Sequence, residues 1–392
     1  MKRILIHDFG GYGFPVTLSN SLQSRGYTVG HAYCSSLITT PRNVTKTSHD
    51  VTLLPIQTKH PLNKYNFIER WKQELEYGHL AQKVILHFNP DIVISANAPL
   101  NAQKRIHQTC AKHGIPFIFW LQDRIGLATS QVLKKKIPVF GSGIGVFYQM
   151  IEGQLLRKSN AIISITDDFI PYLENLHIAP ERYHIIENWG TLSSFHGDPN
   201  MWSKQHQLSD LPIFLYAGTL SMKHNPSILL DLSLQLGDQA QVVVVSQGKG
   251  ADWLKDALKQ SPHLNLTVLP YQNPDQLPAM YASADILLVL LTEDASEFSV
   301  PSKLLTCLCA GKPILSAIPQ NNLATRIINK SGAGFVTKPE DHDMFGHQAK
   351  YLLHHPDICT SMSEKAQKWA QENFEINRIT DQFETIITLV QS

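Results

Sequence analysis

The sequence predicts an α/β protein built from two Rossmann-like, doubly wound domains with a helical C-terminal tail. Its 392 residues suit two domains of ordinary size. Short β-branched runs alternate with helical patterns, which favours parallel strands joined by right-handed crossovers. A polar stretch, residues 191–211, interrupts this alternation, which then restarts. We therefore expect two domains facing a central cleft, with ligands at the carboxyl ends of the strands.

In the first half, continuous apolar runs such as Ile92-Val93-Ile94 are typical of strands buried on both faces. The predicted strands are residues 2–7, 27–33, 51–56, 91–96, 116–121, 161–165 and 183–186. The predicted helices are residues 15–24, 65–88, 102–113 and 169–175.

The second half repeats the pattern, and the tail from residue 342 onward is almost entirely helical. Its predicted strands are residues 213–217, 241–246, 264–269, 285–291 and 313–317. Its predicted helices are residues 226–236, 251–259, 275–284, 302–310 and 323–329. We place the domains at residues 1–195 and 196–374 and expect a last helix, residues 375–392, to pack back on the first domain.

The composition excludes several classes of protein. Lys and Arg number 34 against 33 Asp and Glu, too small a basic excess for a general nucleic-acid binder. Five scattered cysteines without a CxxC, and 18 histidines without metal-ligand spacing, support neither a disulfide framework nor a zinc site. No apolar run reaches the roughly 20 residues that span a bilayer. We expect a cytoplasmic protein without a metal cofactor.

A glycine turn follows the first predicted strand. It reads His7-Asp8-Phe9-Gly10-Gly11 and precedes a helix. Gly10 and Gly11 would let the backbone approach a phosphate or a sugar, and the helix N-terminus would offer free amides. The turn lacks the dinucleotide spacing GxGxxG, so a simple strand-to-helix turn is an equal alternative.

A lysine follows the first strand of the second half. Gly218, Thr219 and Lys223 lie between that strand and Asn225-Pro226, which we interpret as an N-cap and a first helical residue. A diphosphate would satisfy both the lysine and the positive end of the helix. A solvated lysine on a loop is the alternative.

A loop rich in acids and hydroxyls precedes the predicted helix 302–310. Pro301 suits its first turn, and Ser299, Ser302 and Lys303 bring hydroxyls and a positive charge to its N-terminus. Thr306 follows Lys303 by three residues and so shares its face. A well-capped core helix would explain the apolar residues but not the loop.

These stretches resemble the retaining glycosyltransferases of family 4, and more narrowly the bacterial colanic-acid and O-antigen transferases. The resemblance spans nearly the whole chain and depends on the joint order of weak motifs. They are Trp120-Leu121-Gln122-Asp123, Ile186-Glu187-Asn188-Trp189, Tyr216-Ala217-Gly218-Thr219-Leu220, Tyr281-Ala282-Ser283-Ala284-Asp285, Val300-Pro301-Ser302-Lys303, Ala310-Gly311-Lys312-Pro313-Ile314, Asn322-Leu323-Ala324 and Ala333-Gly334.

The resemblance implies a GT-B fold with an acceptor-side first domain and a second domain that binds the nucleotide sugar, most often UDP-linked. It implies that Lys223 contacts the diphosphate, with Thr219 where the family often has an arginine. Of the family's two glutamates, the ribose-binding one falls at Thr306, and Asp294 or Glu297 is the candidate for the other. Val300 and Gln272 complete the donor-binding set, and Asn188 lines the cleft from the first domain.

Asp123 is the candidate catalytic residue. The resemblance places it at the transferring sugar, where a carboxylate would orient the sugar or stabilise an oxocarbenium ion. A helix cap is the alternative. The expected co-substrate is a nucleotide sugar, and the expected acceptor is lipid-linked or a small molecule.

Three rival functions remain. A metal-dependent GT-A transferase needs a DxD, and the one such tripeptide, Asp341-His342-Asp343, lies at an apparent helix start where acids are expected as caps. A GT-B epimerase shares the two-domain plan. A non-catalytic sugar- or nucleotide-binding module would bind ligand without turnover.

Residues 134–158 combine a lysine run with an apolar helical pattern closed by Arg157-Lys158. Basic residues beside an apolar face suit the anionic inner face of a membrane. A core-packing helix with a solvated lysine run is the alternative, which the pattern favours slightly.

Overall fold

The computed structural model of the chain describes residues 1–37, 50–62, 67–96, 98–136, 141–191, 198–296 and 300–391. The chain forms two compact units. The first consists of Met1–Asn188 with Glu375–Ser392, and the second of Trp189–Phe374.

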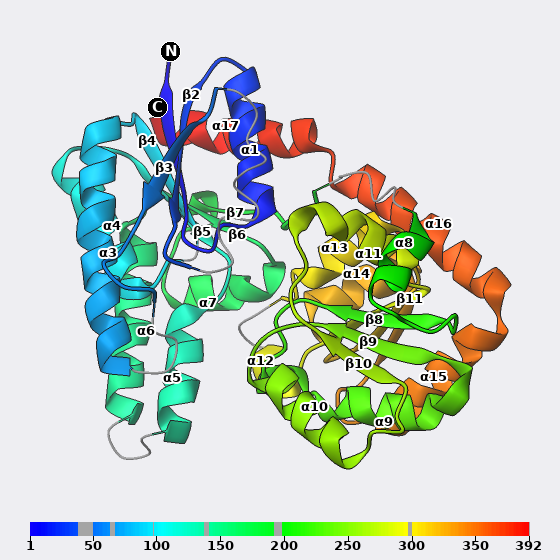
Figure 1. Ribbon diagram of the computed structural model, residues 1–392. Coiled ribbons are helices and arrows are strands. Elements are labelled where there is room, and N and C mark those ends of the chain that lie inside the picture. The colour runs from blue at the N-terminus through cyan, green and yellow to red at the C-terminus, as the bar shows by residue number, and fades with distance from the viewer. Residues whose placement is uncertain are drawn as a thin grey trace. The chain divides into compact units, whose positions relative to one another are not determined.

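The first unit is built on a seven-stranded parallel sheet with the order β3-β2-β1-β4-β5-β6-β7 (Figure 1). The predicted strands are confirmed, with small shifts at their ends. The bounds are β1 Arg3–Asp8, β2 Thr28–Cys34, β3 Thr52–Ile56, β4 Ile92–Ala96, β5 Phe117–Leu121, β6 Ala161–Ser164 and β7 Tyr183–Ile185.

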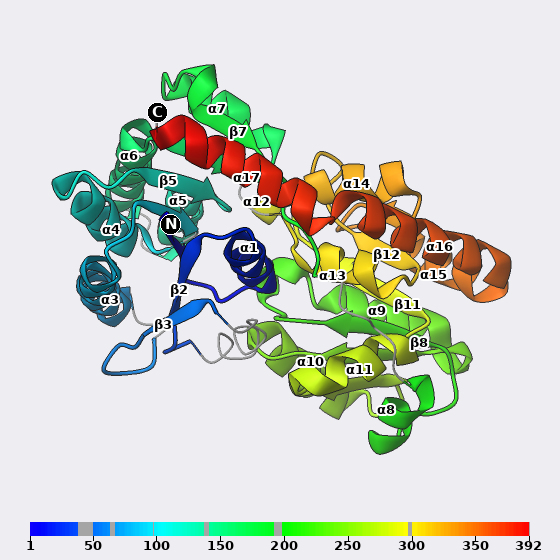
Figure 2. The same ribbon diagram turned by 90° about the horizontal axis from the view of Figure 1, so that it is seen from above.

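Helices cover this sheet. They are α1 Gly13–Ser24, α3 Phe67–Phe88, α4 Leu100–Lys112, α5 Ile125–Lys136, α6 Gly141–Lys158, α7 Ile170–Asn175 and α17 Ile376–Gln391. Two short 3₁₀ helices, η1 Asp167–Phe169 and η2 Pro180–Arg182, accompany them. The last helix, α17, lies along α1 (Figure 2). Phe383 packs edge-on against Trp120 with ring centroids 5.0 Å apart, and Thr380 donates a 2.8 Å hydrogen bond to Ser21 Oγ.

The second unit contains a six-stranded parallel sheet with the order β10-β9-β8-β11-β12-β13. The strands are β8 Ile213–Ala217, β9 Gln241–Val245, β10 Leu266–Leu269, β11 Ile286–Leu290, β12 Ile314–Ala317 and β13 Gly334–Thr337. The edge strand β13 is absent from the predicted set. It is short, begins with a glycine and is mostly half-buried, so it carries little strand signal.

The helices of this unit confirm the predicted alternation, with changes at their ends. They are α8 Pro199–Gln205, α9 Ser227–Leu236, α10 Lys249–Gln260, α11 Leu277–Ser283, α12 Glu293–Ser296, α13 Lys303–Ala310, α14 Leu323–Ser331, α15 His342–His354 and α16 Pro356–Asn373. Three 3₁₀ helices, η3 Met222–His224, η4 Gly237–Gln239 and η5 Pro274–Gln276, lie between them.

The interpretation of residues 191–211 as a plain linker is wrong in part. This stretch contains α8, whose Trp202 is buried and donates a 3.2 Å hydrogen bond to Gln272 Oε1. A buried tryptophan inside a polar stretch is the signal for packed structure there.

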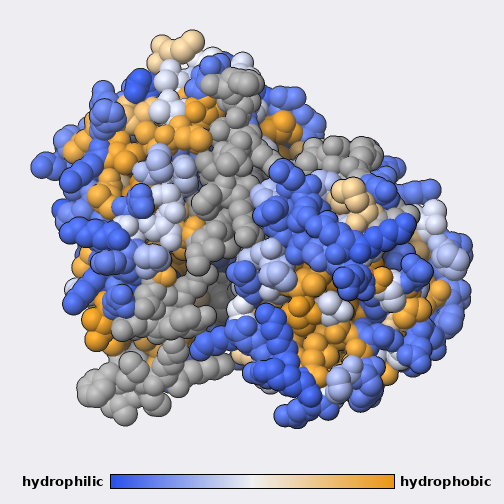
Figure 3. All heavy atoms as spheres, viewed as in Figure 1, coloured by the Kyte–Doolittle hydropathy of each residue, from blue (hydrophilic) through white to orange (hydrophobic). Residues whose placement is uncertain are grey.

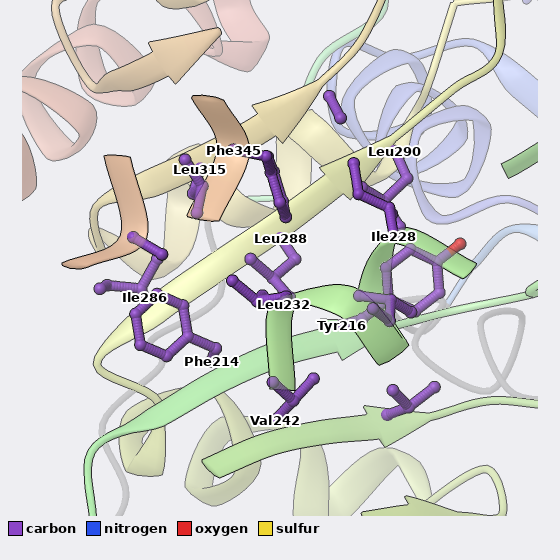
Figure 4. Packing of buried hydrophobic residues seen from close by; sticks show 14 of the residues in the cluster. Phe214, Tyr216, Ile228, Leu232, Val242, Ile286, Leu288, Leu290, Leu315 and Phe345 are labelled. Carbon is purple, nitrogen blue, oxygen red and sulfur yellow. The ribbon is translucent and has the colours of Figure 1, made fainter. Parts of the chain in front are cut away.

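The core of the second unit lies between its sheet and the helices α9 and α15 (Figure 4). Phe214 and Tyr216 project from β8 toward Leu288 of β11, and Phe345 of α15 closes the cluster. Because these side chains are completely or almost completely removed from water, they fix β8 and β11 and so the loops that follow them.

Candidate functional site

The candidate residues gather at the carboxyl ends of strands in each unit. The first sheet reverses its strand order between β1 and β4, and the second between β8 and β11. Loops that leave a parallel sheet on opposite sides of such a point form a natural ligand site. The turn after β1 and the loops after β8 and β11 hold most of the predicted residues.

In the first unit, Asp8 organises the glycine turn. Its buried carboxylate accepts hydrogen bonds from the amides of Gly10 (3.1 Å) and Tyr12 (2.5 Å). Gly11 has a φ of 64°, and a Cβ on Gly10 would collide with the Tyr12 ring at 2.3 Å, so both positions favour glycine. Asp8 therefore occupies the amides of Gly10 and Tyr12, which precede α1, and the expectation that the helix N-terminus itself offers amides to a ligand stays a prediction.

Burial sets the protonation of Asp8. It raises the pKa of the carboxyl from 3.8 to about 7, even though the amides of Tyr12, Gly10 and Gly11 act in the opposite direction. A carboxylate that accepts backbone hydrogen bonds ordinarily has a low pKa, so desolvation is the larger effect here. Asp8 can thus exchange a proton near neutral pH.

Tyr12 connects this turn with the predicted catalytic residue. Desolvation of the hydroxyl, and after it the negative charges of Asp123 and Asp8, raises the pKa of Tyr12 above its ordinary value of 10.0, although the residue as a whole is 40% exposed. Asp123 lies two residues beyond β5 and is half-buried, and its carbonyl accepts a 3.0 Å hydrogen bond from Ile125 N at the start of α5. The structure therefore groups Asp8, Tyr12 and Asp123 at one edge of the first sheet.

Asn188 closes the first unit beside the same strand ends. Its side-chain amide donates a 2.6 Å hydrogen bond to Gln122 Oε1, next to Asp123. Gln122 was not among the predicted site residues, although a glutamine directly after the apolar run of β5 was a signal for it in the sequence.

A buried polar network lies beneath the turn. His7 contacts Ser95 Oγ through Nδ1 (2.8 Å) and the Tyr77 hydroxyl through Nε2 (2.9 Å). His31 Nδ1 lies 2.8 Å from Ser19 Oγ. Burial lowers the pKa of His7 to about 3 and that of His31 to about 4, so both imidazoles are neutral at pH 7. Neutral imidazoles suit packing in this core.

In the second unit, the loop after β8 depends on glycines. Gly218 has a φ of 128° and Gly248 a φ of 115°, conformations that L side chains rarely adopt. A Cβ on Gly248 or Gly250 would lie 2.9 Å from the Leu220 carbonyl oxygen. The loops after β8 and β9 therefore approach each other closely.

Two tyrosines that the sequence analysis did not select support Thr219. Tyr216 donates from its hydroxyl to the Thr219 carbonyl (3.0 Å), and the Tyr271 hydroxyl lies 2.5 Å from Thr219 Oγ1. Aromatic residues with polar tips at strand ends were the available signal. Thr219 itself is exposed at this edge of the sheet.

Lys303 joins the two loops of the switch point. Its Nζ lies 3.3 Å from the centroid of the Tyr216 ring, a cation–π contact between α13 and β8. A Cβ on Gly218 would lie 3.1 Å from Lys303 Cε, so glycine makes room for the lysine stem. The structure thus brings Gly218, Thr219 and Lys303 together.

The start of α13 differs from the prediction. The helix begins at Lys303 with Ser302 as its N-cap residue, so Pro301 lies in the preceding turn, where its carbonyl accepts from Leu304 N at 3.1 Å. Val300 and Thr306 are half-buried, and Ser302 is exposed. Asp294 is exposed in the short helix α12, whereas the predicted residues Ser299 and Glu297 lie outside the described residues.

The loop that carries Lys223 also differs. The backbone of Lys223 lies in η3, and its side chain is outside what the structure describes. Asn225 is not the N-cap of α9: it has a left-handed conformation at φ 47°, and Pro226 precedes the helix. Asparagine tolerates this conformation, and its Oδ1 accepts a 2.8 Å hydrogen bond from Ser227 Oγ.

The side chain of Gln272 makes hydrogen bonds with α8 and the residue that follows it, and with the carbonyl of Pro270. Its Oε1 accepts from Trp202 Nε1 (3.2 Å) and contacts His206 Nε2 (2.9 Å), while its Nε2 donates to the Pro270 carbonyl (2.8 Å). These contacts fix α8, so we leave Gln272 out of the proposed donor site.

Asp341 of the DxD tripeptide caps a helix, which is the role predicted for these acids instead of metal binding. Asp341 is the N-cap of α15, and its Oδ1 accepts a 3.0 Å hydrogen bond from Met344 N. His342 pairs with Asp231 at 2.5 Å. Within the described ranges, no group of three or more histidine, cysteine or acidic side chains is arranged to hold a metal ion.

The comparisons with known proteins agree with this geometry. Residues 200–369, all within the second unit, match the family model described as "Glycosyl transferases group 1". No curated protein matches the sequence.

Solved structures match over nearly the full length of the chain. The sucrose-phosphate synthase of Thermosynechococcus elongatus shares 14% identity at a TM-score of 0.76, covering 99% of this chain and 98% of that one. HepE of Anabaena in complex with UDP and glucose shares 14% identity at a TM-score of 0.74, covering 99% and 100%. WaaG, a glycosyltransferase involved in lipopolysaccharide biosynthesis, shares 15% identity at a TM-score of 0.66, covering 98% and 99%.

These neighbours define the fold as GT-B, with two Rossmann-like units. The family match lies in the second unit, and these structures, at 14 to 15% identity, show the fold alone.

Proposed function

We propose that this chain is a retaining glycosyltransferase. It moves a hexosyl or N-acetylhexosaminyl group from a UDP-linked donor to an acceptor, without a metal ion, in the biosynthesis of a cell-surface polysaccharide or another glycoconjugate. The observation that carries the proposal is the position of Lys303, whose ammonium group is held beside Gly218 at the switch point of the second sheet.

The chemistry of the donor explains why a fixed cation matters there. Glycosyl transfer releases a nucleoside diphosphate, and negative charge grows on its oxygens as the glycosidic bond breaks. A cation positioned in advance stabilises that charge without reorganising at the moment of reaction. Tyr216 and Gly218 fix the Lys303 stem, and Lys223 is the proposed second cation on the adjoining loop.

The remaining donor contacts follow from the same loops. Thr219, Val300, Ser302 and the proposed Ser299 supply hydroxyls and amides, and Thr306 is the proposed ribose contact one turn after Lys303. A threonine hydroxyl makes a weaker bond to ribose than a carboxylate does. Asp294 is the proposed acid near the sugar. HepE, whose structure was solved with UDP and glucose, supports a UDP-linked donor.

The first unit would supply the group that acts at the sugar. We assign this role to Asp123, because a half-buried carboxylate can stabilise positive charge as an oxocarbenium ion develops. Asn188 would contact donor or acceptor from the same edge, and Asp8 fixes the turn beside it. The proposed acceptor is lipid-linked or a small glycoside.

One experiment separates this proposal from its rivals. The protein, treated with EDTA, is incubated with a panel of UDP-sugars, and proton NMR follows the first-formed sugar anomer of transfer or hydrolysis. Retention with full activity in EDTA is expected. Activity restored only by magnesium or manganese contradicts the charge-stabilisation mechanism, conversion to an epimeric UDP-sugar assigns the epimerase, and UDP binding without turnover assigns the binding module.

A further inference from the structure

The solvent face of α6 carries three apolar side chains in its second and third turns. Val146, Phe147 and Met150 are 53%, 55% and 56% exposed, and all three lie on the side of the helix that faces away from its neighbours. Tyr148, Ile151 and Leu155, at helical spacing, are buried instead. The core-packing interpretation therefore accounts for one face of α6 and leaves the other unexplained.

This face lies away from α5, the helix that packs beside α6 (Figure 1). A Cβ on Gly145 would lie 2.4 Å from Ser130 Oγ, and a Cβ on Gly141 would lie 2.2 Å from the Leu133 carbonyl. The two helices thus pack at glycine-contact distance along the opposite side of α6. The exposed side chains lie on the side of α6 away from this contact.

Exposure alone would not distinguish this face. Apolar and polar residues are interspersed over the surface in view in Figure 3, as on most proteins. The distinguishing feature is charge. Glu152 is the one acid in the sequence of α5 and α6, and it is buried, accepting from Gly126 N and the Tyr172 hydroxyl at 3.0 Å each.

The described charges at the surface of the hairpin are consequently basic. Lys134 is exposed in the last turn of α5, and Arg157 and Lys158 are exposed in the last turn of α6. An apolar stripe flanked by basic residues, on two helices that expose no acid of their own, complements a surface that is apolar below and anionic above. A protein partner would more commonly require mixed polar pairing at the rim.

We propose that the face of Val146, Phe147 and Met150, with Lys134 and Arg157, docks on an anionic lipid bilayer. Within the described residues no helix is both long and apolar enough to cross a membrane, so the contact would be interfacial. The docked enzyme would meet the acceptor of the proposed function at the membrane surface. Only this statement about the acceptor rests on the proposed function.

Co-sedimentation with vesicles tests the docking directly. Wild-type protein should bind vesicles that contain phosphatidylglycerol, bind pure phosphatidylcholine vesicles much less, and lose binding as salt rises. The double variant F147S/M150S should reduce the partition coefficient at least about tenfold, because two exposed apolar side chains no longer enter the bilayer. Lys134→Glu should reduce it by several-fold at low salt only.

The matched control is L234S/M344S, which removes two similarly exposed side chains from the second unit and should bind vesicles like wild type. UDP affinity, measured by calorimetry without vesicles, should be unchanged in every variant, so failure of the docking and failure of the proposed function are distinguishable. Equal sedimentation of F147S/M150S and wild type, or no binding to anionic vesicles at low salt, would overturn the proposal. A dimer in light scattering that F147S/M150S abolishes would overturn it as well, by assigning the face to a second copy of the chain.

Discussion

The carboxylate of Asp8 accepts a 2.5 Å hydrogen bond from the backbone amide of Tyr12, the residue before α1. The same carboxylate binds the Gly10 amide, so one buried acid fixes the path of the chain from β1 to α1. Tyr12 in turn lies within the electrostatic range of Asp123. The position of the turn beside the candidate catalytic residue thus depends on a group that titrates near neutral pH.

Asp8 should make the stability of the protein decrease as pH rises from about 4 to about 7. Its pKa is raised from 3.8 to about 7, so in this window the folded state keeps a proton that the unfolded chain has released. Asp8→Asn does not titrate. The unfolding free energy of wild type minus that of Asp8→Asn, measured in urea at several pH values, should therefore decrease as pH rises from about 4 to about 7. Parallel curves for the two proteins would contradict the raised pKa.

His31 should have the opposite pH dependence. Burial lowers its pKa from 6.5 to about 4, so between these values the unfolded chain binds a proton that the folded state refuses. Stability is lost as pH falls from 6.5 toward 4, by about 3 kcal/mol for a shift of this size. His31→Gln keeps a polar group beside Ser19 and removes the titration. Its unfolding free energy should vary less with pH over this range, and an unaltered slope would show that another group is responsible.

The fold could be predicted from the sequence because most of its strands and helices have clear hydrophobic patterns of their own. The buried run Ile92-Val93-Ile94 is apolar in whatever context it folds, so β4 was predicted almost to the residue. The strand β13 and the helix α5 were missed. Gly334 and the weakly amphipathic start of α5 derive their structure from tertiary packing and carry little intrinsic preference.

The candidate site was harder to predict, because its geometry depends on contacts between segments far apart in sequence. The sequence indicated Lys303 and Gly218, but their meeting over Tyr216 joins β8 with α13. Asp8 was visible as part of a strand end, yet its occupation of the turn amides depends on burial. The hydrogen bond from Trp202 of α8 to Gln272 is a second contact of this kind, because it joins segments 70 residues apart.

Lys303→Met should weaken UDP binding while keeping the packing of the lysine stem. Loss of one charge-assisted contact to phosphate is worth roughly 1.5–3 kcal/mol, or about 10- to 150-fold in affinity. Lys312→Met is the matched control: Lys312 is also half-buried and donates a 3.0 Å hydrogen bond to the Ala282 carbonyl, but it precedes β12 at the amino end of the sheet. Calorimetry should show a large loss of UDP affinity for Lys303→Met and none for Lys312→Met. Equal affinities in both variants would remove Lys303 from the donor site.

Asp123→Asn separates catalysis from helix capping. If Asp123 stabilises positive charge on the transferring sugar, its contribution belongs to the transition state. The variant should then lose orders of magnitude in kcat, while its affinity for the donor changes little. Asparagine caps helices nearly as well as aspartate, so a capping role at the start of α5 predicts normal turnover and normal stability. Initial rates with saturating UDP-sugar, together with thermal unfolding, measure both. Near-normal kcat would exclude Asp123 from the reaction and leave it as an electrostatic neighbour of the turn.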